Sequence, residues 1–254
     1  MRGISGLLTR GRVIVAVVIA VAAVAAGGTA VALTTSPPSH VVSMATAGRT
    51  SAALKITAGT PVLELSVGTL GGTLLRVSTP DDAPVRPVLS GSGLIRLSLA
   101  GAGPAYGQGS GHSQGSGYAV KVVLNSAVTW SLDLAGGTQY TEADLRGGKV
   151  GGIAVTAGSD VLDVSLPKPA GTLPFLLAGG ASQFLLSLPG GVAAQVTVGG
   201  GASFVSVDDQ NLTGVAGGTV LTPPGWATAT SRFDIDATSG FSRLTVRRWY
   251  PAGS

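Results

Sequence analysis

The chain has no cysteine, only two histidines and few aromatic residues, and each shortage excludes some chemistry. Without cysteine there are no disulfides, zinc–thiolate sites, thiol nucleophiles or lipid-modified cysteine anchors. His40 and His112 stand in segments of small and polar residues. Neither is held rigidly by neighbours, as the base of a catalytic triad must be, and neither has a second metal ligand nearby. We therefore expect no cofactor, no metal and no histidine-based catalysis.

Charge is also scarce, at 11% of residues, against roughly a quarter in an average protein. Three of the sixteen basic residues, Arg2, Arg10 and Arg12, precede a long apolar run, and all twelve acidic residues follow it. The rest of the chain is close to neutral, so the high isoelectric point comes mostly from the N-terminal tail. This distribution argues against a nucleic-acid partner.

The apolar run from Val13 to Leu33 is uncharged and 21 residues long, enough to cross a bilayer as a helix. Because Arg10 and Arg12 precede it, we expect residues 1–12 in the cytoplasm and the C-terminal part outside the cell. One interpretation is a signal anchor that holds a single-pass membrane protein. The alternative is a signal peptide cleaved near Ala32, after Ala30-Val31-Ala32, which would give a secreted protein.

Residues 34–50 are small and polar and contain Pro37-Pro38, which predicts an extended linker. Residues 51–250 are then expected to form one extracellular β-strand-repeat domain. Two stretches interrupt its pattern. Residues 101–117 are rich in Gly and Ser and predict a flexible loop, and residues 208–230 predict a longer insertion.

The most informative feature is a weak internal repeat. The segment ITAGTPVLELSV, which begins at Ile56, matches VTAGSDVLDVSL, which begins at Val155, at six of twelve positions. A pair formed by a small residue and glycine recurs at steps of 22, 21 and 21 residues. Its members are Ala135-Gly136, Ala157-Gly158, Ala178-Gly179 and Gly199-Gly200.

Each repeat unit consists of a short β segment, a glycine turn and a second segment with period-2 alternation. Leu162, Val164 and Leu166, for example, alternate with Asp163 and Ser165. Units of this size must stack on their neighbours to bury their apolar faces. We expect an all-β fold, either a β-solenoid (or solenoid-like sandwich) of 21-residue repeats or an ordinary antiparallel sandwich. Two closing strands, at residues 231–236 and 241–249, are expected to cap the stack.

The segment VTAGSDVLDVSL and the closing RFDIDATSGFSRLTVRR, from Arg232 to Arg248, resemble a bacterial family of adhesin-like β-strand-repeat domains of unknown function. Domains of this family are common in actinobacteria and often follow a single membrane span. The resemblance covers residues 51–250, and its motifs are degenerate patterns of small residues. It implies a membrane-anchored β-solenoid ectodomain at the cell surface, and it supplies no catalytic residue.

Clustered carboxylates are the remaining candidates for chemistry, because β-helix enzymes that process polysaccharides use such groups. Turn formation explains Asp208 and Asp209, which end a strand. Alternation places Asp234 and Asp236 of the closing strand on one face, expected to be the solvent face beside Arg232. The candidate pairs are Asp208 with Asp209, Asp160 with Asp163, and Asp234 with Asp236.

Arg243, Arg247 and Arg248 form a basic cluster near the C-terminus. Alternation puts Arg243 and Arg247 on one face, where they would either meet an anionic envelope polymer or lipid head groups, or form a solvated edge that discourages strand pairing.

Two functions follow: a non-catalytic surface module for adhesion, scaffolding or sensing, whose partner is an envelope polymer or surface protein, or a polysaccharide-processing β-helix enzyme. We favour the first and assign no catalytic residue. An enzyme would need a groove lined by acids and aromatic rings. Trp130, Trp226 and Trp249, which could stack on sugars, are far apart in the sequence.

Overall fold

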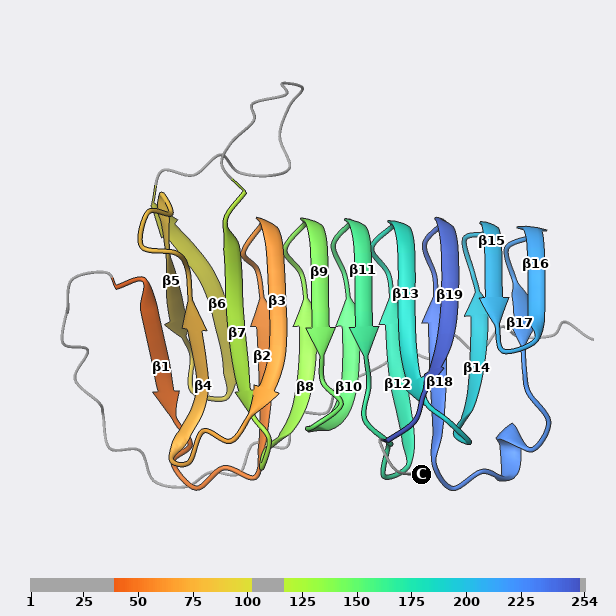
Figure 1. Ribbon diagram of the computed structural model, residues 1–254, viewed down its shortest axis with the longest axis horizontal. Helices are drawn as coiled ribbons and strands as arrows, with labels where there is room; N and C mark the ends of the chain where they lie inside the picture. Colours follow the sequence, from red (N-terminus) through yellow and green to blue (C-terminus); the bar gives the residue numbers. More distant parts are fainter. Residues whose placement is uncertain (1–38, 102–116, 252–254) are drawn as a thin grey trace, which may run out of the picture. The chain divides into compact units, whose positions relative to one another are not determined.

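The computed structural model describes residues 39–101 and 117–251, which form nineteen β-strands and one short 3-10 helix, η1 (Trp226–Thr228). The strands make two mixed sheets that pack face to face (Figure 1). Sheet A contains, in spatial order, β1 (Val41–Ala45), β4 (Thr73–Ser78), β7 (Ala119–Asn125), β3 (Thr60–Gly68), β9 (Thr138–Asp144), β11 (Ser159–Ser165), β13 (Ala181–Pro189), β19 (Phe241–Trp249), β15 (Ala202–Val207) and β16 (Gln210–Val215). Sheet B contains β17 (Thr219–Leu221), β14 (Ala193–Val198), β18 (Arg232–Ala237), β12 (Thr172–Leu177), β10 (Lys149–Val155), β8 (Thr129–Leu134), β2 (Ser51–Ile56), β6 (Leu94–Gly101) and β5 (Val85–Ser90).

Each repeat unit places one strand in sheet B and the next strand in sheet A. The successive pairs β8/β9, β10/β11 and β12/β13 lie side by side, and equivalent strands pair in parallel and in register (Figure 1). The two similar sequence segments occupy equivalent places, because Thr60 and Ser159 both pair with Thr138. The all-β class and the repeat are confirmed, and the ordinary antiparallel sandwich is wrong for these strands.

The strand order departs from the sequence order at two places. The pair β2/β3 lies between β6/β7 and β8/β9, and the final pair β18/β19 lies between β12/β13 and β14/β15. The prediction that the closing strands cap the stack is therefore wrong. Strand β19 pairs in parallel with β13 on one side and with β15 on the other, and its Leu244 and Val246 are buried in the core.

Both ends of the stack are made of antiparallel strands, so a regularly wound, closed solenoid is not seen in the described residues. Strand β1 pairs with β4, and β5 with β6, at one end; β16 pairs with β15, and β17 with β14, at the other. Strand β5 carries Pro87, which has no N–H to offer along this edge.

Two predicted boundaries need correction. Strand β1 lies within residues 34–50, which we expected to be linker, because Val42 and Met44 pack against the core. Strands β16 and β17 lie within 208–230, expected to be an insertion, because the turn at Asp208 and Asp209 reverses the chain onto β15.

The predicted membrane segment lies outside the residues that the structure describes, as does nearly all of the predicted loop 101–117. Within the described ranges, no helix has the length and apolar character that a membrane crossing needs.

The core between the sheets follows the alternation seen in the sequence. Leu162, Val164 and Leu166 are fully buried. The rings of Phe175 on β12 and Phe184 on β13 stack across the sheets with centroids 5.2 Å apart. Burial of such side chains contributes about 1.5–3 kcal/mol each, so the core accounts for most of the stability that a chain without disulfides needs.

Two glycines of the repeated pairs are required by close backbone approach between neighbouring units. A Cβ atom at Gly136 would overlap the carbonyl oxygen of Ala58, and one at Gly179 would overlap that of Ala157. Neither glycine has a positive φ. The recurrence of glycine here therefore reflects the tight stacking of one corner on the next.

Substitutions in β13 test the assignment of its two faces. Leu186 is fully buried and Leu185 faces outward. We expect Leu186→Ala to lower the free energy of unfolding by about 2–5 kcal/mol, because it opens a cavity in the core. Leu185→Ala is the matched control and should cost about 1 kcal/mol or less. Urea titration of both variants measures the difference, and equal losses would contradict the assigned faces.

Candidate functional site

Strands β9, β11 and β13 share an irregularity near their first residue. Ser159 pairs with Thr138 on one side and Ala181 on the other, and pairing resumes only at Val161. One residue is skipped in both strands of each pair, so the register does not shift and the neighbouring strands are irregular at the same place. Asp160 and Val161 consequently both face away from the core, although simple alternation would bury one of them.

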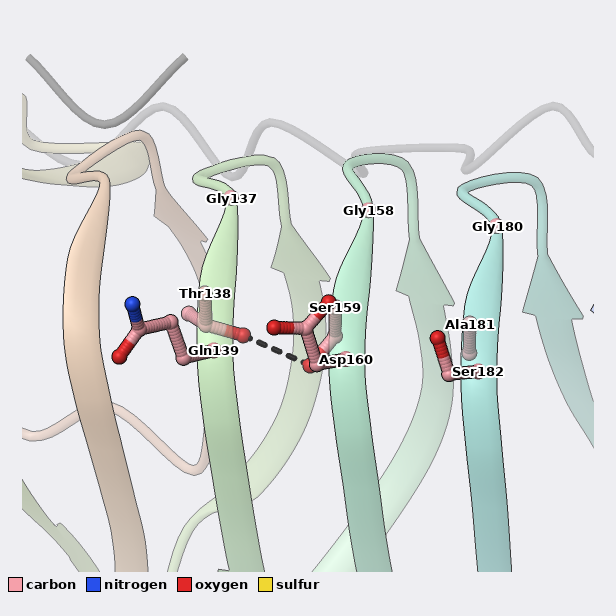
Figure 2. A pocket seen from close by; sticks show the side chains of 9 residues that line it. All are labelled: Gly137, Thr138, Gln139, Gly158, Ser159, Asp160, Gly180, Ala181 and Ser182. Atoms are coloured by element: carbon pink, nitrogen blue, oxygen red, sulfur yellow. Dashed lines mark hydrogen bonds between the residues drawn. The ribbon is translucent and has the colours of Figure 1, made fainter. Parts of the chain in front are cut away.

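Hydroxyl groups on the inner side stabilise this irregularity. The Ser159 hydroxyl donates to the Val161 carbonyl oxygen at 2.9 Å, and the Thr138 hydroxyl donates to Ser159 Oγ at 2.9 Å (Figure 2). Thr138 Oγ1 also lies 2.7 Å from the buried Thr141 Oγ1. The three hydroxyls therefore form one chain of hydrogen bonds that ends on a backbone carbonyl and leaves no buried hydroxyl unpaired.

A groove of about 590 Å³ runs across the start of these strands. Each strand contributes a glycine, a small inward residue and an outward polar residue. Figure 2 shows the outward side chains of Gln139, Asp160 and Ser182 following one another along the groove. The nine lining residues are Gly137, Thr138, Gln139, Gly158, Ser159, Asp160, Gly180, Ala181 and Ser182.

The outward polar groups of the groove are free to bind a ligand. Gln139, Asp160 and Ser182 are exposed, and their side chains make no hydrogen bond or ion pair to any described residue. Their backbones, in contrast, are held in the central part of a ten-stranded sheet. The groove thus presents polar side chains on a rigid backbone frame, so binding has to order those side chains but not the strands that carry them.

An aromatic ring lies beside the groove. Tyr140 follows Gln139 on the outer face and has an exposed fraction of 36%. Its pKa is raised by partial burial and then by the negative charges of Glu142 and Asp163, which face outward on the same and the next strand. The phenol therefore stays neutral, and its face and hydroxyl are both available for contact.

No basic side chain lines the groove, and the nearest ones are occupied. Lys121 on β7 forms an ion pair with Glu64 at 3.1 Å. Arg243 on β19 lies with its guanidinium carbon 4.5 Å from the ring centroid of Phe204 on β15, the strand on the far side of β19 from β13. Asp160 is therefore the one charged side chain that lines the groove, while Arg243, on the strand next to β13, keeps its positive charge beside Gln183.

The other predicted acid pairs do not line this groove, although Asp208 and Asp209 line a smaller pocket of about 170 Å³. Asp208 lies in a turn with a φ of 51°, and both its oxygens accept hydrogen bonds from Arg248, at 2.6 and 2.8 Å. These bonds lower the pKa of Asp208. Asp234 and Asp236 face outward on one strand, as predicted, and burial followed by the charge of Asp234 raises the pKa of Asp236.

The predicted arginine cluster is divided by the structure. Strand β19 is internal to sheet A, so the interpretation of Arg243, Arg247 and Arg248 as a solvated edge is wrong. Arg248 is engaged with Asp208, and its Nη1 also donates to the Val192 carbonyl oxygen at 2.8 Å.

Four predicted candidates have structural partners, and one cannot be placed. The His40 ring is half-buried with Nδ1 3.0 Å from Thr79 Oγ1, so it is part of the fold and not of a solvated linker. Trp130 is buried, Trp226 lies under the guanidinium of Arg232 at 4.5 Å, and Trp249 donates to the Leu166 carbonyl oxygen. None of these indoles faces the groove. His112 lies outside the described residues.

Sequence analysis missed the groove because the irregularity in the strands is not visible in simple alternation. The signal that could have revealed it is the recurring small or hydroxyl residue at Thr60, Thr138, Ser159 and Ala181, one residue before each break in the pattern. Among the described residues, no group of three or more His, Asp or Glu side chains has a geometry that could hold a metal ion.

No family model matches the chain, and no curated protein does. The fold is similar to that of a solved structure from Clostridium sporogenes named a "putative cell adhesion protein". The two align with a TM-score of 0.60 at 15% sequence identity, over 82% of this chain and 98% of the other. At this identity the likeness shows that the fold is shared.

The shifted pKa values of Asp208 and Asp236 make opposite predictions for stability. The pKa of Asp208 is lower in the folded state than its unfolded value of about 3.9, so its carboxylate stabilises the fold above that pH and the effect is lost as pH falls. The pKa of Asp236 is raised, so its carboxylate destabilises the fold near neutral pH and the penalty disappears on protonation.

We therefore expect Asp208→Asn to lower the free energy of unfolding at pH 7 by up to about 1 kcal/mol, since both groups are partly solvated. Asp236→Asn should raise it by a similar amount or less. Both differences should shrink on going to about pH 3. Urea titrations at the two pH values measure them, and destabilisation by Asp236→Asn at pH 7 would contradict the assigned environment.

Proposed function

We propose that this chain is a non-catalytic, adhesin-like module of the cell surface, whose β domain presents a binding groove outside the cell. The observation that carries the proposal is the row formed by Gln139, Asp160 and Ser182, whose polar groups have no partner among the described residues. Side chains that face solvent from the centre of a rigid sheet are suited to binding. The parallel repeats support a solenoid-like winding, flattened into two sheets, as the frame.

The likeness to the Clostridium sporogenes structure supports the same role, because that protein is named for cell adhesion. The apolar run from Val13 to Leu33, with Arg10 and Arg12 before it, supports a single-pass membrane protein with its N-terminus in the cytoplasm. We place the domain on the extracellular side, held there by this segment.

The positions of the acids favour binding over polysaccharide cleavage. Glycoside hydrolysis usually needs two carboxyl groups that flank the bond, separated by about 5–9.5 Å. Asp160 is the sole acid that lines the described groove. Asp208 is held by Arg248, and Asp234 and Asp236 project from the same face of one strand. Neither of these pairs lines the groove across strands β9, β11 and β13.

Adhesion of whole cells tests the proposal. We expect a non-adherent bacterial host that produces the full chain to adhere to glycan-coated surfaces or to other cells more strongly than the same host producing the chain without residues 51–254. The full chain with Leu186→Asp, produced in the same amount, tests whether adherence depends on the folded domain, because this substitution puts a charge into the core. Unchanged adherence to all surfaces, or sugar released from envelope polysaccharide by the purified protein, would reject the adhesin-like module.

Fractionation tests the membrane anchor. If residues 13–33 stay in the bilayer, the protein should remain with membranes after a high-salt wash, since salt removes only proteins held by charge. Its N-terminus should be Met1 or Arg2, and external protease should release the β domain from intact cells. Arg10→Glu with Arg12→Glu should weaken export or invert the orientation. A soluble secreted protein that begins at Leu33 would establish cleavage near Ala32 instead.

A further inference from the structure

The charge of the groove restricts the chemistry of its ligand. Asp160 lines it, Glu142 and Asp163 face outward beside it, and no cation lines it. An anionic polymer such as a nucleic acid, a teichoic-acid-type phosphate chain or a sulfated glycan would be repelled by these carboxylates and would find no counter-charge among the lining residues. The ligand is therefore either uncharged or positively charged.

The remaining lining groups distinguish between these two classes. A cation could bind the carboxylate and the side-chain oxygen atoms of Gln139 and Ser182, but it would leave the amide N–H groups of Gln139 unused. A hydroxyl-rich chain uses all of them, because the amide and the hydroxyl each donate and accept, and the carboxylate of Asp160 accepts from two neighbouring hydroxyls. Tyr140 adds a ring on which the apolar face of a sugar can stack.

We propose that the groove binds an uncharged glycan chain laid across strands β9, β11 and β13. The inference rests on the proposed adhesin-like function and names the ligand of that function. Successive sugar units would meet Gln139, Asp160 and Ser182 in turn, since neighbouring strands present these side chains about 4.8 Å apart. The ligand would run perpendicular to the strands, along the direction in which the repeat units stack.

The open floor of the groove is consistent with a ligand and is not required by folding. Gly137, Gly158 and Gly180 have no positive φ, and a Cβ atom at each would lie 3.5–3.7 Å from the nearest carbonyl oxygen, an ordinary contact. Gly136 and Gly179, one residue earlier, tolerate no Cβ. The backbone therefore accounts for the earlier glycines, whereas those in the groove serve to keep it free of side chains.

Binding to defined oligosaccharides tests this inference. The full-length protein, purified in detergent, is applied to an array of neutral, acidic and amino-sugar oligosaccharides, and each bound compound is titrated by calorimetry. We expect binding to neutral oligosaccharides that changes little between low and about 0.5 M salt. Gln139→Ala with Asp160→Ala should weaken it by about tenfold or more, because hydrogen bonds to a charged and a neutral group are lost together.

The matched control is Asp82→Ala with Gln210→Ala, which removes the same two side-chain types from exposed turn and edge positions. It should leave affinity unchanged, and both double variants should unfold at the same urea concentration as the parent. Absence of any neutral ligand, equal binding by the groove variant, or salt-sensitive binding confined to amino sugars and polylysine would overturn the inference. Cell adherence retained by the groove variant would reject the groove while leaving the adhesin-like function standing.

Discussion

Parallel, in-register stacking of equivalent strands is the constraint on which the rest of the structure depends. Because Thr138, Ser159 and Ala181 lie in one row, residues of one repeat lie beside their equivalents in the next. Inward rows of leucine and valine build a continuous core, close corners exclude all side chains at Gly136 and Gly179, and the skipped residue forms a continuous irregularity across the sheet. A single irregular strand would disturb its neighbours. The same irregularity in three neighbours makes a groove.

The sequence predicted those parts of the fold that recur. The alternation of Leu162, Val164 and Leu166 is a local signal, and it was confirmed because each residue meets its own equivalent in the next unit. The glycine pairs indicated the corners, but Gly158 is equivalent to Gly137 and Gly180, and not to Gly136 and Gly179. The order of the units could not be predicted. Strands β12 and β14 both pair in parallel with β18 over all of Arg232–Ala237. The local pattern therefore does not say which pair of strands lies next to β12.

The candidate site was less predictable than the fold, for two physical reasons. Alternation cannot show that Gln139 and Tyr140 both face outward, because this depends on a hydroxyl chain that crosses from one strand to the next. Tryptophan is the usual sugar-stacking residue, but the indoles of Trp130 and Trp249 donate to backbone carbonyls within the fold. Residue type therefore pointed to tryptophans that do not face the groove. The structure is needed to show that the ring of Tyr140 lies beside it.

The position of the final strands couples the groove to a distant part of the chain. Strand β13, which carries Ser182, pairs on one side with β11 and on the other with β19, about sixty residues later in the sequence. The corner that precedes β13 also lies against the corner that precedes β19. A Cβ atom added at Gly180 would lie 3.5 Å from the Gly240 carbonyl oxygen. Strands β9 and β11 can stack as they emerge, but β13 has both neighbours only when the C-terminal pair has entered between β12/β13 and β14/β15. The last of the three strands that line the groove is thus completed by a strand from about sixty residues later in the chain, which ties the rigidity of the binding surface to the integrity of the whole stack.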